Sequence, residues 1–271
     1  MDSLPIKFQV KKNGVWMLLL LAALMAASTE SRKAKVVDSF EYIAMNCRAH
    51  SASITEFGAV GDGKTSNTKA FKDAVDHLGQ FSSDGGSQLY VPAGKWLTGS
   101  FSVVSHFTLF LHQDAVLLAS QSGVRIKTAV GRGGFVKDIY VRRMTMHTMK
   151  WAFWMTGNYG SHADKNYDPN ALPVIQNINY RDMAADNVSM AARLEGIAGD
   201  PFTQICISNV TIGMAAKAKK VPWTCSDVGG ITAGVSPRPC DLLPEQGPGK
   251  MEETLPIDSV ELKTCSYKIN Y

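Results

Sequence analysis

The feature that most constrains the fold is a strand-like segment that occurs three times in the second half of the chain. The copies read VKDIYVRRMTM at residues 136–146, IQNINYRDMAA at 175–185 and FTQICISNVTI at 202–212, and their central isoleucines are 39 and 27 residues apart. Unequal spacing with a preserved strand pattern is typical of a solenoid with loops of different lengths. The repeats predict a parallel β-helix, in which each coil buries its inward side chains against its neighbours. A β-sandwich is the alternative, and it explains the repeats less economically.

The first half of the chain predicts short strands and a single helix. Alternating apolar residues separated by turn residues predict strands at residues 53–57, 88–91, 96–103, 106–112 and 115–118. A helix is expected at 66–78, with Ser66 or Asn67 as its N-cap. Its apolar residues recur on one face: Ala70, Phe71, Ala74, Val75 and Leu78. We expect this helix to cap the open end of an all-β solenoid.

The N-terminus has the layout of a secretory signal peptide. Lys7, Lys11 and Lys12 precede an uninterrupted apolar run at residues 15–27, which ends in small side chains. A spanning helix needs about 20 apolar residues, so this run is short for a membrane anchor. Residues 1–27 therefore predict secretion to the extracellular region or cell wall, with an uncleaved anchor as the alternative.

Three further segments follow the predicted signal peptide. Residues 28–52 are expected to be a linker, and residues 53–236 to form the β-helix. Residues 237–271 contain five prolines and lose the strand periodicity. Such a composition predicts a partly disordered C-terminal tail.

Secretion implies an oxidising compartment, where cysteines pair. The chain has five cysteines, so at least one stays unpaired within the chain. Cys225 and Cys240 flank a loop rich in Gly and Pro, and we expect them to form a disulfide. Two glycosylation sequons begin at Asn187 and Asn209, and each asparagine is expected on the surface. The cysteine and histidine spacings match no zinc site, so no metal is predicted.

Residues 58–65, read GAVGDGKT, match the phosphate-binding pattern GxxxxGK[ST]. In that pattern the backbone amides hold phosphates, Lys64 neutralises them and Thr65 holds magnesium. No second strand ending in a metal-binding Asp follows in a βαβ context, and secretion would remove the chain from cytosolic nucleotide. We therefore interpret the segment as a tight turn before the helix and predict no nucleotide partner.

A basic cluster is the main candidate for binding. Between residues 122 and 150, only Asp138 opposes seven cations: Arg125, Lys127, Arg132, Lys137, Arg142, Arg143 and Lys150. Arg125 and Lys127 are two residues apart, so on a strand they share a face and can hold a carboxylate. An acidic polysaccharide is the natural ligand outside the cell, and a solvated outer face is the alternative. The net charge of +4 over 271 residues is small for a nucleic-acid binder.

Four aromatic residues follow this cluster: Trp151, Phe153, Trp154 and Tyr159. Aromatic rings can stack on sugar rings, but more often they fill a core. We expect Trp151 and Phe153 to share one strand face and to lie in the core.

Four separated blocks of the sequence resemble plant polygalacturonase-like proteins. They are ITEFGAVGDGKTSNTKAF at 54–71, LYVPAGKWLTGSF at 89–101, SGVRIKTAVGRGGFVKDIYV at 122–141, and WTCSDVGG with PRPC within 223–240. These proteins are pectin-lyase-like right-handed β-helices of glycoside hydrolase family twenty-eight. The resemblance implies inverting hydrolysis of the α-1,4-galacturonan of cell-wall pectin, without a metal or organic cofactor. It also implies that Arg125 and Lys127, within the block similar to the family's RIK region, bind substrate, and we expect a monomer.

The chain departs from that family in its central part. The family's catalytic carboxylates lie in NTD, GDD and GHG blocks, and this sequence contains none of them. Residues 116–121, similar to the early coils, run directly into residues 122–125 of the late coils, so the central coils are missing. An inverting glycosidase needs two carboxyl groups about 6.5–9.5 Å apart. We therefore nominate no catalytic residue among the remaining acids: Asp138, Asp164, Asp168, Asp182, Asp186, Asp200 and Glu195.

Three functions stay open at this point. The chain hydrolyses pectin with carboxylates that the sequence does not assign, or it binds pectate through Arg125 and Lys127 without chemistry. If the apolar N-terminal segment is retained, it is a membrane-tethered structural remnant. We expect hydrolysis to be weak or absent.

Overall fold

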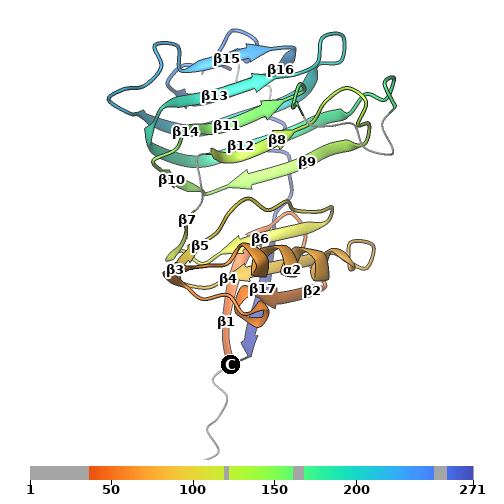
Figure 1. Ribbon diagram of the computed structural model, residues 1–271, viewed down its shortest axis with the longest axis vertical. Coiled ribbons are helices and arrows are strands. Elements are labelled where there is room, and N and C mark those ends of the chain that lie inside the picture. The colour runs from red at the N-terminus through yellow and green to blue at the C-terminus, as the bar shows by residue number, and fades with distance from the viewer. Residues whose placement is uncertain (1–36, 119–121, 161–167, 247–254, 271) are drawn as a thin grey trace, which may run out of the picture. The chain divides into compact units, whose positions relative to one another are not determined.

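The computed structural model describes residues 37–118, 122–160, 168–246 and 255–270 (Figure 1). The predicted signal peptide at residues 1–27 lies outside these ranges. Within them the chain forms strands that lie mostly in parallel sheets, one α-helix, α2 (Thr68–Gly79), and one short 3-10 helix, η1 (Ile54–Phe57). No helix in the described ranges is long and apolar enough to cross a membrane. The predicted parallel β-helix with a single helix at its N-terminal end is confirmed.

The N-terminal coils build two parallel sheets of three strands. One sheet contains β2 (His50–Ser53), β4 (Ser87–Val91) and β6 (Phe107–Leu111), and the other contains β3 (Asp62–Ser66), β5 (Gly94–Leu97) and β7 (Ala115–Leu118). α2 packs on the core between them through the apolar face that the sequence predicted. Phe71 of this face is fully buried, and its ring stacks on that of Phe101 at 4.6 Å between centroids.

The C-terminal coils build two further parallel sheets. One has the order β15-β13-β11-β8, and the other contains β9, β10, β12, β14 and β16. The strand bounds are β8 (Ser122–Lys127), β9 (Phe135–Arg142), β10 (Thr145–His147), β11 (Trp151–Thr156), β12 (Val174–Val188), β13 (Met190–Glu195), β14 (Phe202–Met214), β15 (Trp223–Ser226) and β16 (Val228–Ser236). Figure 1 shows these strands stacked coil upon coil in the upper part of the view.

The strand register confirms the sequence repeat. Ile178 of β12 pairs with Ile139 of β9 on one side and with Ile205 of β14 on the other. These are the isoleucines that align the three repeats, and Ile178 and Ile205 are fully buried. Equivalent residues of successive coils therefore stack inside the solenoid, as parallel coils require.

Residues in the left-handed conformation bend the coils at regular intervals. Asp138, Asn177 and Gln204 occupy one corner, with φ of 57°, 55° and 55°, and each precedes a repeat isoleucine. Five residues later a second corner contains Arg143, Asp182, Asn209 and, in the next coil, Gly234, all with positive φ. Asn, Asp and Gly are the residues that adopt this conformation at the lowest cost. The corners explain why polar residues recur at fixed places in the repeats.

The segment predicted as a strand at residues 53–57 folds differently. Strand β2 ends at Ser53, and the chain turns into η1 through a capping box. In it the Ser53 backbone N–H donates to Glu56 Oε1 at 2.6 Å, while the Ser53 hydroxyl accepts from the Thr55 N–H. This reciprocal arrangement favours a helical turn over a strand.

The helix N-terminus also differs from the expected capping. Asn67 is the N-cap residue of α2 by position, but its side chain makes no capping hydrogen bond to the helix. Its amide instead accepts from the Val60 N–H at 2.8 Å and donates to the Val60 carbonyl at 3.0 Å. Asn67 is buried and fastens the preceding glycine-rich turn to the helix.

The glycine-rich turn is closed by its own carboxylate. Asp62 Oδ1 accepts from the backbone N–H groups of Lys64 and Thr65, both at 2.8 Å, and Oδ2 accepts from the Thr65 hydroxyl at 2.8 Å. These hydrogen bonds lower the Asp62 pKa from 3.8 to about 2. The Lys64 and Thr65 amides and the Thr65 hydroxyl are thus already occupied by an anion, which favours a structural role for residues 58–65. Part of this segment differs from the expected turn, because Asp62–Ser66 forms strand β3 and pairs with β5.

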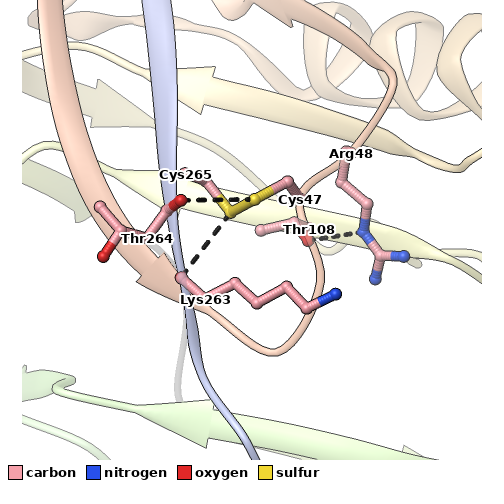
Figure 2. Close-up of a disulfide and its surroundings, with 6 residues drawn as sticks. All are labelled: Cys47, Arg48, Thr108, Lys263, Thr264 and Cys265. Carbon is pink, nitrogen blue, oxygen red and sulfur yellow. Dashed lines mark hydrogen bonds between the residues drawn. A yellow bond between two sulfur atoms is a disulfide. The ribbon is translucent and has the colours of Figure 1, made fainter.

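The chain ends differ from the expected linker and tail. Val37–Ala44 forms strand β1 and pairs with β17 (Lys263–Asn270), so both segments contain ordered strands. The Cys47–Cys265 disulfide joins positions 218 residues apart (Figure 2), a pairing that the sequence does not predict. Residues 37–41 and 266–270 belong to one compact unit, and residues 42–265 form the other. Each strand gains its backbone partner from the far end of the chain, a pairing that local periodicity does not reveal.

The remaining cysteines follow the expected arrangement. Cys225 and Cys240 are joined by a disulfide, and Cys206 is a buried free thiol. Cys206 packs against Leu255 and Ile257, which lie in the segment that returns toward β17. Leu255 and Ile257 of the predicted tail therefore cover apolar surface on β14.

The two stacks of coils are separate in their backbone pairing. Among the described residues, no ladder joins β6 or β7 to β8, β9 or β10. The change from one stack to the other falls between Leu118 and Ser122, where the sequence runs from the early coils into the late coils. The N-terminal and C-terminal cores are likewise distinct clusters of buried residues.

Candidate functional site

Arg125 lies in the middle of β8, at one edge of the sheet β15-β13-β11-β8. The register places Trp154 beside it, followed by Arg193 on β13 and Thr224 on β15. These four residues are partly or fully exposed. They form an outward row across the strands, because residues at one register position share a face of a parallel sheet.

Lys127 belongs to the next outward row of the same sheet. It pairs in register with Thr156 on β11, which in turn pairs with Glu195 on β13. Ile126, between the two cations, points into the C-terminal core and is buried. The alternation expected from the spacing of Arg125 and Lys127 is therefore present in β8.

Aromatic rings hold the cations in place. The Arg125 guanidinium carbon lies 5.0 Å from the centroid of the Trp154 ring, and Lys127 Nζ lies 4.2 Å from that of Tyr159. Lys150 Nζ lies 4.3 Å from the Trp151 ring, and the two tryptophan rings stack at 4.9 Å. We call this set the cation–aromatic row: Arg125, Lys127, Lys150, Trp151, Trp154 and Tyr159.

The row can bind carboxylates with little reorganisation. Within the described part of the chain, Arg125, Lys127 and Lys150 form no ion pair within 4 Å. Cation–π contacts contribute about 0.5–1 kcal/mol each at exposed sites, and they restrict the positions of the charged groups. Positioning before binding reduces the entropy lost when a ligand arrives. The partly exposed side chains of the two tryptophans add apolar surface of the kind that packs against sugar rings.

One sequence prediction about these aromatic residues is wrong. Phe153 is fully buried, but Trp151 is partly exposed and stacks on Trp154 instead of joining Phe153 in the core. Ala152 and Phe153 are consecutive buried residues, so the strict alternation assumed for this strand does not hold. Strict alternation places Trp151 on the same core-facing side as Phe153, and this is why the sequence predicts the wrong face for Trp151.

The sheet carries very little negative charge. Glu195 is the only carboxylate within β8, β11, β13 and β15. Its Oε1 accepts from Arg193 Nε at 2.8 Å, and both side chains are partly exposed. Sequence reasoning counted Glu195 among the acids but did not foresee Arg193, which extends the outward row of Arg125.

In the sheet of β9, β10, β12, β14 and β16, acidic side chains stand at the corners of the coils or pair with a neighbour on the surface. Asp138 accepts from Asn177 Nδ2 at 2.7 Å, and Asp182 accepts from Asn209 Nδ2 at 2.6 Å. Asp186 Oδ1 lies 2.5 Å from His147 Nδ1 at an exposed position. Each of these acids already has a partner in the neighbouring coil.

The last three candidate acids lie in loops or outside the described residues. Asp168 Oδ1 accepts from the Asn170 N–H at 2.9 Å, in a local turn. Asp200 follows β13, and its buried Oδ2 has no hydrogen-bond partner within the described ranges. Asp164 lies outside those ranges. The structure thus assembles no pair of carboxylates beside Arg125 from the described strands.

The basic cluster of the sequence does not form one surface. Arg125, Lys127 and Lys150 come together in the cation–aromatic row. Arg142 lies on β9, in the other sheet, where its Nη2 donates to the Ile257 carbonyl at 3.4 Å. Lys137 lies on the same strand, with its Nζ 5.3 Å from the centroid of the Phe135 ring. Residues that are close in sequence are separated in the fold because β8 and β9 belong to different sheets, so the charged surface is smaller than the sequence suggests.

Asn187 and Asn209, the two sequon asparagines, are exposed. Both are corner residues with positive φ, and Asn187 Nδ2 donates to Thr148 Oγ1 at 3.1 Å. Within the described ranges, His, Cys, Asp and Glu form no group of three that could hold a metal ion.

Comparison with known proteins places the fold in a class. The family described as rhamnogalacturonase A/epimerase, pectate lyase-like matches residues 51–110. This segment contains α2 and most of the N-terminal coils. The chain is thus a pectin-lyase-like parallel β-helix.

Individual relatives define the family more closely. The chain is 39% identical to a "Probable polygalacturonase" of Vitis vinifera, in an alignment that covers 97% of this chain and 95% of the relative. It is 41% identical over 87 residues to an "Exo-poly-alpha-D-galacturonosidase" of Dickeya chrysanthemi, covering 32% of this chain and 14% of that protein. A "Probable endopolygalacturonase E" of Aspergillus niger is 25% identical over 132 residues, which are 49% of this chain and 30% of that protein. The chain belongs to the polygalacturonase-like proteins of glycoside hydrolase family twenty-eight.

The Vitis vinifera alignment also shows how much shorter this chain is. The aligned span is 471 positions and the chain has 271 residues, so at least 200 of those positions have no counterpart here. A solenoid tolerates the loss of whole coils better than other folds, because each coil contacts mainly its neighbours.

Proposed function

We propose that this protein binds the galacturonan of cell-wall pectin along the cation–aromatic row and hydrolyses it weakly or not at all. The observation that carries the proposal is the charge of one sheet face. Arg125 and Lys127 lie there over aromatic rings, while Glu195 is the only carboxylate in the four strands. Such a face attracts a polyuronate but offers one acid where the chemistry needs two.

The binding half of the proposal follows from the chemistry of the row. Each uronate carries one carboxylate, and the planar guanidinium of Arg125 can receive it with two parallel hydrogen bonds. Lys127 and Lys150 supply point charges on either side of Trp154, and the stacked tryptophans supply apolar surface. The relatives named polygalacturonase and galacturonosidase support this class of ligand.

The catalytic half follows from the distribution of acids. Inverting hydrolysis needs a proton donor and a base about 6.5–9.5 Å apart, with a water beside the base. Glu195 is held by Arg193, and the described acids of the other sheet pair within their corners. We infer that the aligned positions missing from this chain include the coils that supply both catalytic acids.

Hydrolysis is the second candidate function. It is favoured by the 39% identity to a "Probable polygalacturonase" across most of that protein's length. If the chain does hydrolyse galacturonan, Glu195 is the carboxylate nearest in register to Lys127, and Glu195→Gln should abolish the activity.

The test measures binding and turnover on one preparation. Polygalacturonate should bind at low salt, and binding should weaken as salt screens the charges. Arg125→Ala/Lys127→Ala should reduce affinity about fivefold or more, at about 0.5 kcal/mol per lost pair. The matched control is Lys64→Ala/Lys72→Ala, which removes the same charge from exposed positions of the N-terminal coils. Equal affinities for the two double variants would contradict a site at the row.

We further propose that residues 1–27 direct secretion and that the mature protein is an extracellular glycoprotein, modified at Asn187 and Asn209. The exposure of both asparagines supports this. N-terminal sequencing of the secreted product should begin beyond Ala27. A product that keeps the apolar run would support the membrane-tethered alternative.

A further inference from the structure

A basic groove lies beside the N-terminal ends of β11, β13 and β15. Its volume is about 550 Å³, and the turns before these strands line it at the same place in three successive coils. Its polar lining is made of Thr148, Lys150, Asn187, Ser189, Lys217 and Lys219. The lining contains three ammonium groups and no carboxylate.

Backbone hydrogen bonds between the coils hold this groove open. The Ser189 N–H donates to the Met149 carbonyl at 2.9 Å, and the Lys219 N–H donates to the Ser189 carbonyl at 2.8 Å. The Ala215 N–H donates to the Val188 carbonyl at 2.9 Å. The three turns are thus stacked at fixed spacing, so the lysine stems start from a rigid frame.

The groove lysines are available to a ligand. Lys150, Lys217 and Lys219 are exposed, and none is ion-paired within 4 Å in the described part of the chain. Three unpaired cations around one concavity repel each other, and an anion bound there relieves the repulsion.

The groove is continuous with the cation–aromatic row. Lys150 lines the groove and also lies over Trp151, whose ring stacks on Trp154. From Trp151 to Thr156 the strand extends about 17 Å. One monosaccharide cannot reach both ends of that distance, whereas an oligomer can.

We propose that the groove of Lys150, Lys217 and Lys219 is a second anionic subsite, which holds uronates of the same polysaccharide that the row binds. This inference rests on the proposed function. Each exposed lysine–carboxylate pair contributes little alone. Linked subsites act on one chain, so the second contact forms at high effective concentration and affinity rises with ligand length.

Asn187 affects how the subsite must be tested. It lines the groove and is also a sequon asparagine, so a glycan on Asn187 would occupy part of the same space. The protein is therefore produced in a host that does not glycosylate it. This choice leaves every groove residue intact.

The experiment titrates short and long oligogalacturonates against wild type and Lys217→Ala/Lys219→Ala. The groove variant should bind long oligomers about fivefold more weakly, at about 0.5 kcal/mol per lost pair, and short oligomers as wild type does. Lys64→Ala/Lys72→Ala serves again as the control of equal charge and should bind both ligands nearly as wild type does. Equal binding of long oligomers by the groove and control variants would overturn the proposal.

The outcomes separate this inference from the function on which it rests. If Arg125→Ala/Lys127→Ala weakens the binding of both short and long oligomers while the groove variant weakens the binding of neither, the row binds pectate and the second subsite is absent. If wild type binds neither ligand, the proposed function fails, and the subsite with it.

Discussion

Positive φ explains why two acids of the C-terminal coils are structural. Asp138 and Asp182 stand at corners where the backbone requires a left-handed residue, and each accepts a hydrogen bond from an Asn of the adjacent coil. A short side chain that bonds locally lowers the cost of this conformation. Their recurrence in the repeats reflects the geometry of the bend.

Asn177 offers a direct test of the corners. Its φ is 55°, and its Nδ2 donates to Asp138 and to the Tyr140 hydroxyl. Asn177→Val should lower the free energy of unfolding by at least about 1–2 kcal/mol, because a β-branched residue is strained there. Asn177→Gly should cost less, since glycine adopts positive φ freely. Urea unfolding of both variants measures the difference, and a valine variant as stable as the glycine variant would contradict the account.

The ionisation of Asp62 makes the stability of the glycine-rich turn depend on pH. Its pKa is lowered to about 2, so its ionised form is the one that the folded turn favours. The stabilisation is present above the usual Asp pKa and is lost as the pH falls through about 2. Asp62→Ala should be less stable than wild type at neutral pH, and the difference should shrink below about pH 4. Stability curves of both proteins measured against pH provide the check, and a difference that does not change with pH would contradict it.

Strand β11 combines a core face with the proposed binding face. Phe153 is fully buried, and its ring lies 4.4 Å from that of Tyr180, while Trp151 and Trp154 are partly exposed. Two positions only two residues apart therefore have different roles: Phe153 stabilises the core, and Trp151 belongs to the proposed binding surface.

Two substitutions in β11 should show this separation. Phe153→Ala should cost about 3–5 kcal/mol of unfolding free energy, because it leaves a cavity in the core. Trp151→Ala should change stability by about 1 kcal/mol or less and weaken pectate binding. Chemical unfolding and pectate titration on both variants test the contrast. A large loss of stability in the Trp151 variant would mean that its ring belongs to the core after all.

Elements with strong local patterns could be predicted from the sequence. The apolar face of α2 and the register of Ile139, Ile178 and Ile205 follow from periodicity, and both are confirmed. The face of Trp151 and the groove of Lys217 and Lys219 could not be predicted. They depend on a local break in alternation and on how turns from separate coils stack, and neither has a period in the sequence.

At the scale of the whole molecule, the chain is closed by contacts between its two ends. The Cys47–Cys265 disulfide spans 218 residues, and the Arg48 side chain beside it donates to Thr108 Oγ1 at 3.0 Å (Figure 2). Earlier in the returning segment, Asp258 pairs with Arg181. Such long-range pairings give no local signal, which is why the C-terminal segment resembles a disordered tail in sequence.

The two disulfides should differ in their effect on stability. In the chain-entropy model a loop of 218 residues contributes about 5 kcal/mol, and the Cys225–Cys240 loop of 15 residues contributes about 3 kcal/mol. Cys47→Ser/Cys265→Ser should therefore destabilise the protein more than Cys225→Ser/Cys240→Ser. Unfolding of the two double variants gives the comparison, and the opposite order would show that the terminal closure matters little.

At this scale, we propose that the molecule retains the binding part of a polygalacturonase without the catalytic part. We propose that the cation–aromatic row holds galacturonate, and the sheet that carries the row has one carboxylate within its strands where inversion needs two.

The most direct measurement follows new reducing ends released from polygalacturonate by protein whose binding to the same polymer has been titrated. We predict saturable binding that Arg125→Ala/Lys127→Ala weakens. We also predict that the protein releases no more reducing ends than appear in polymer incubated without it. Sustained release that Glu195→Gln abolishes would contradict the account.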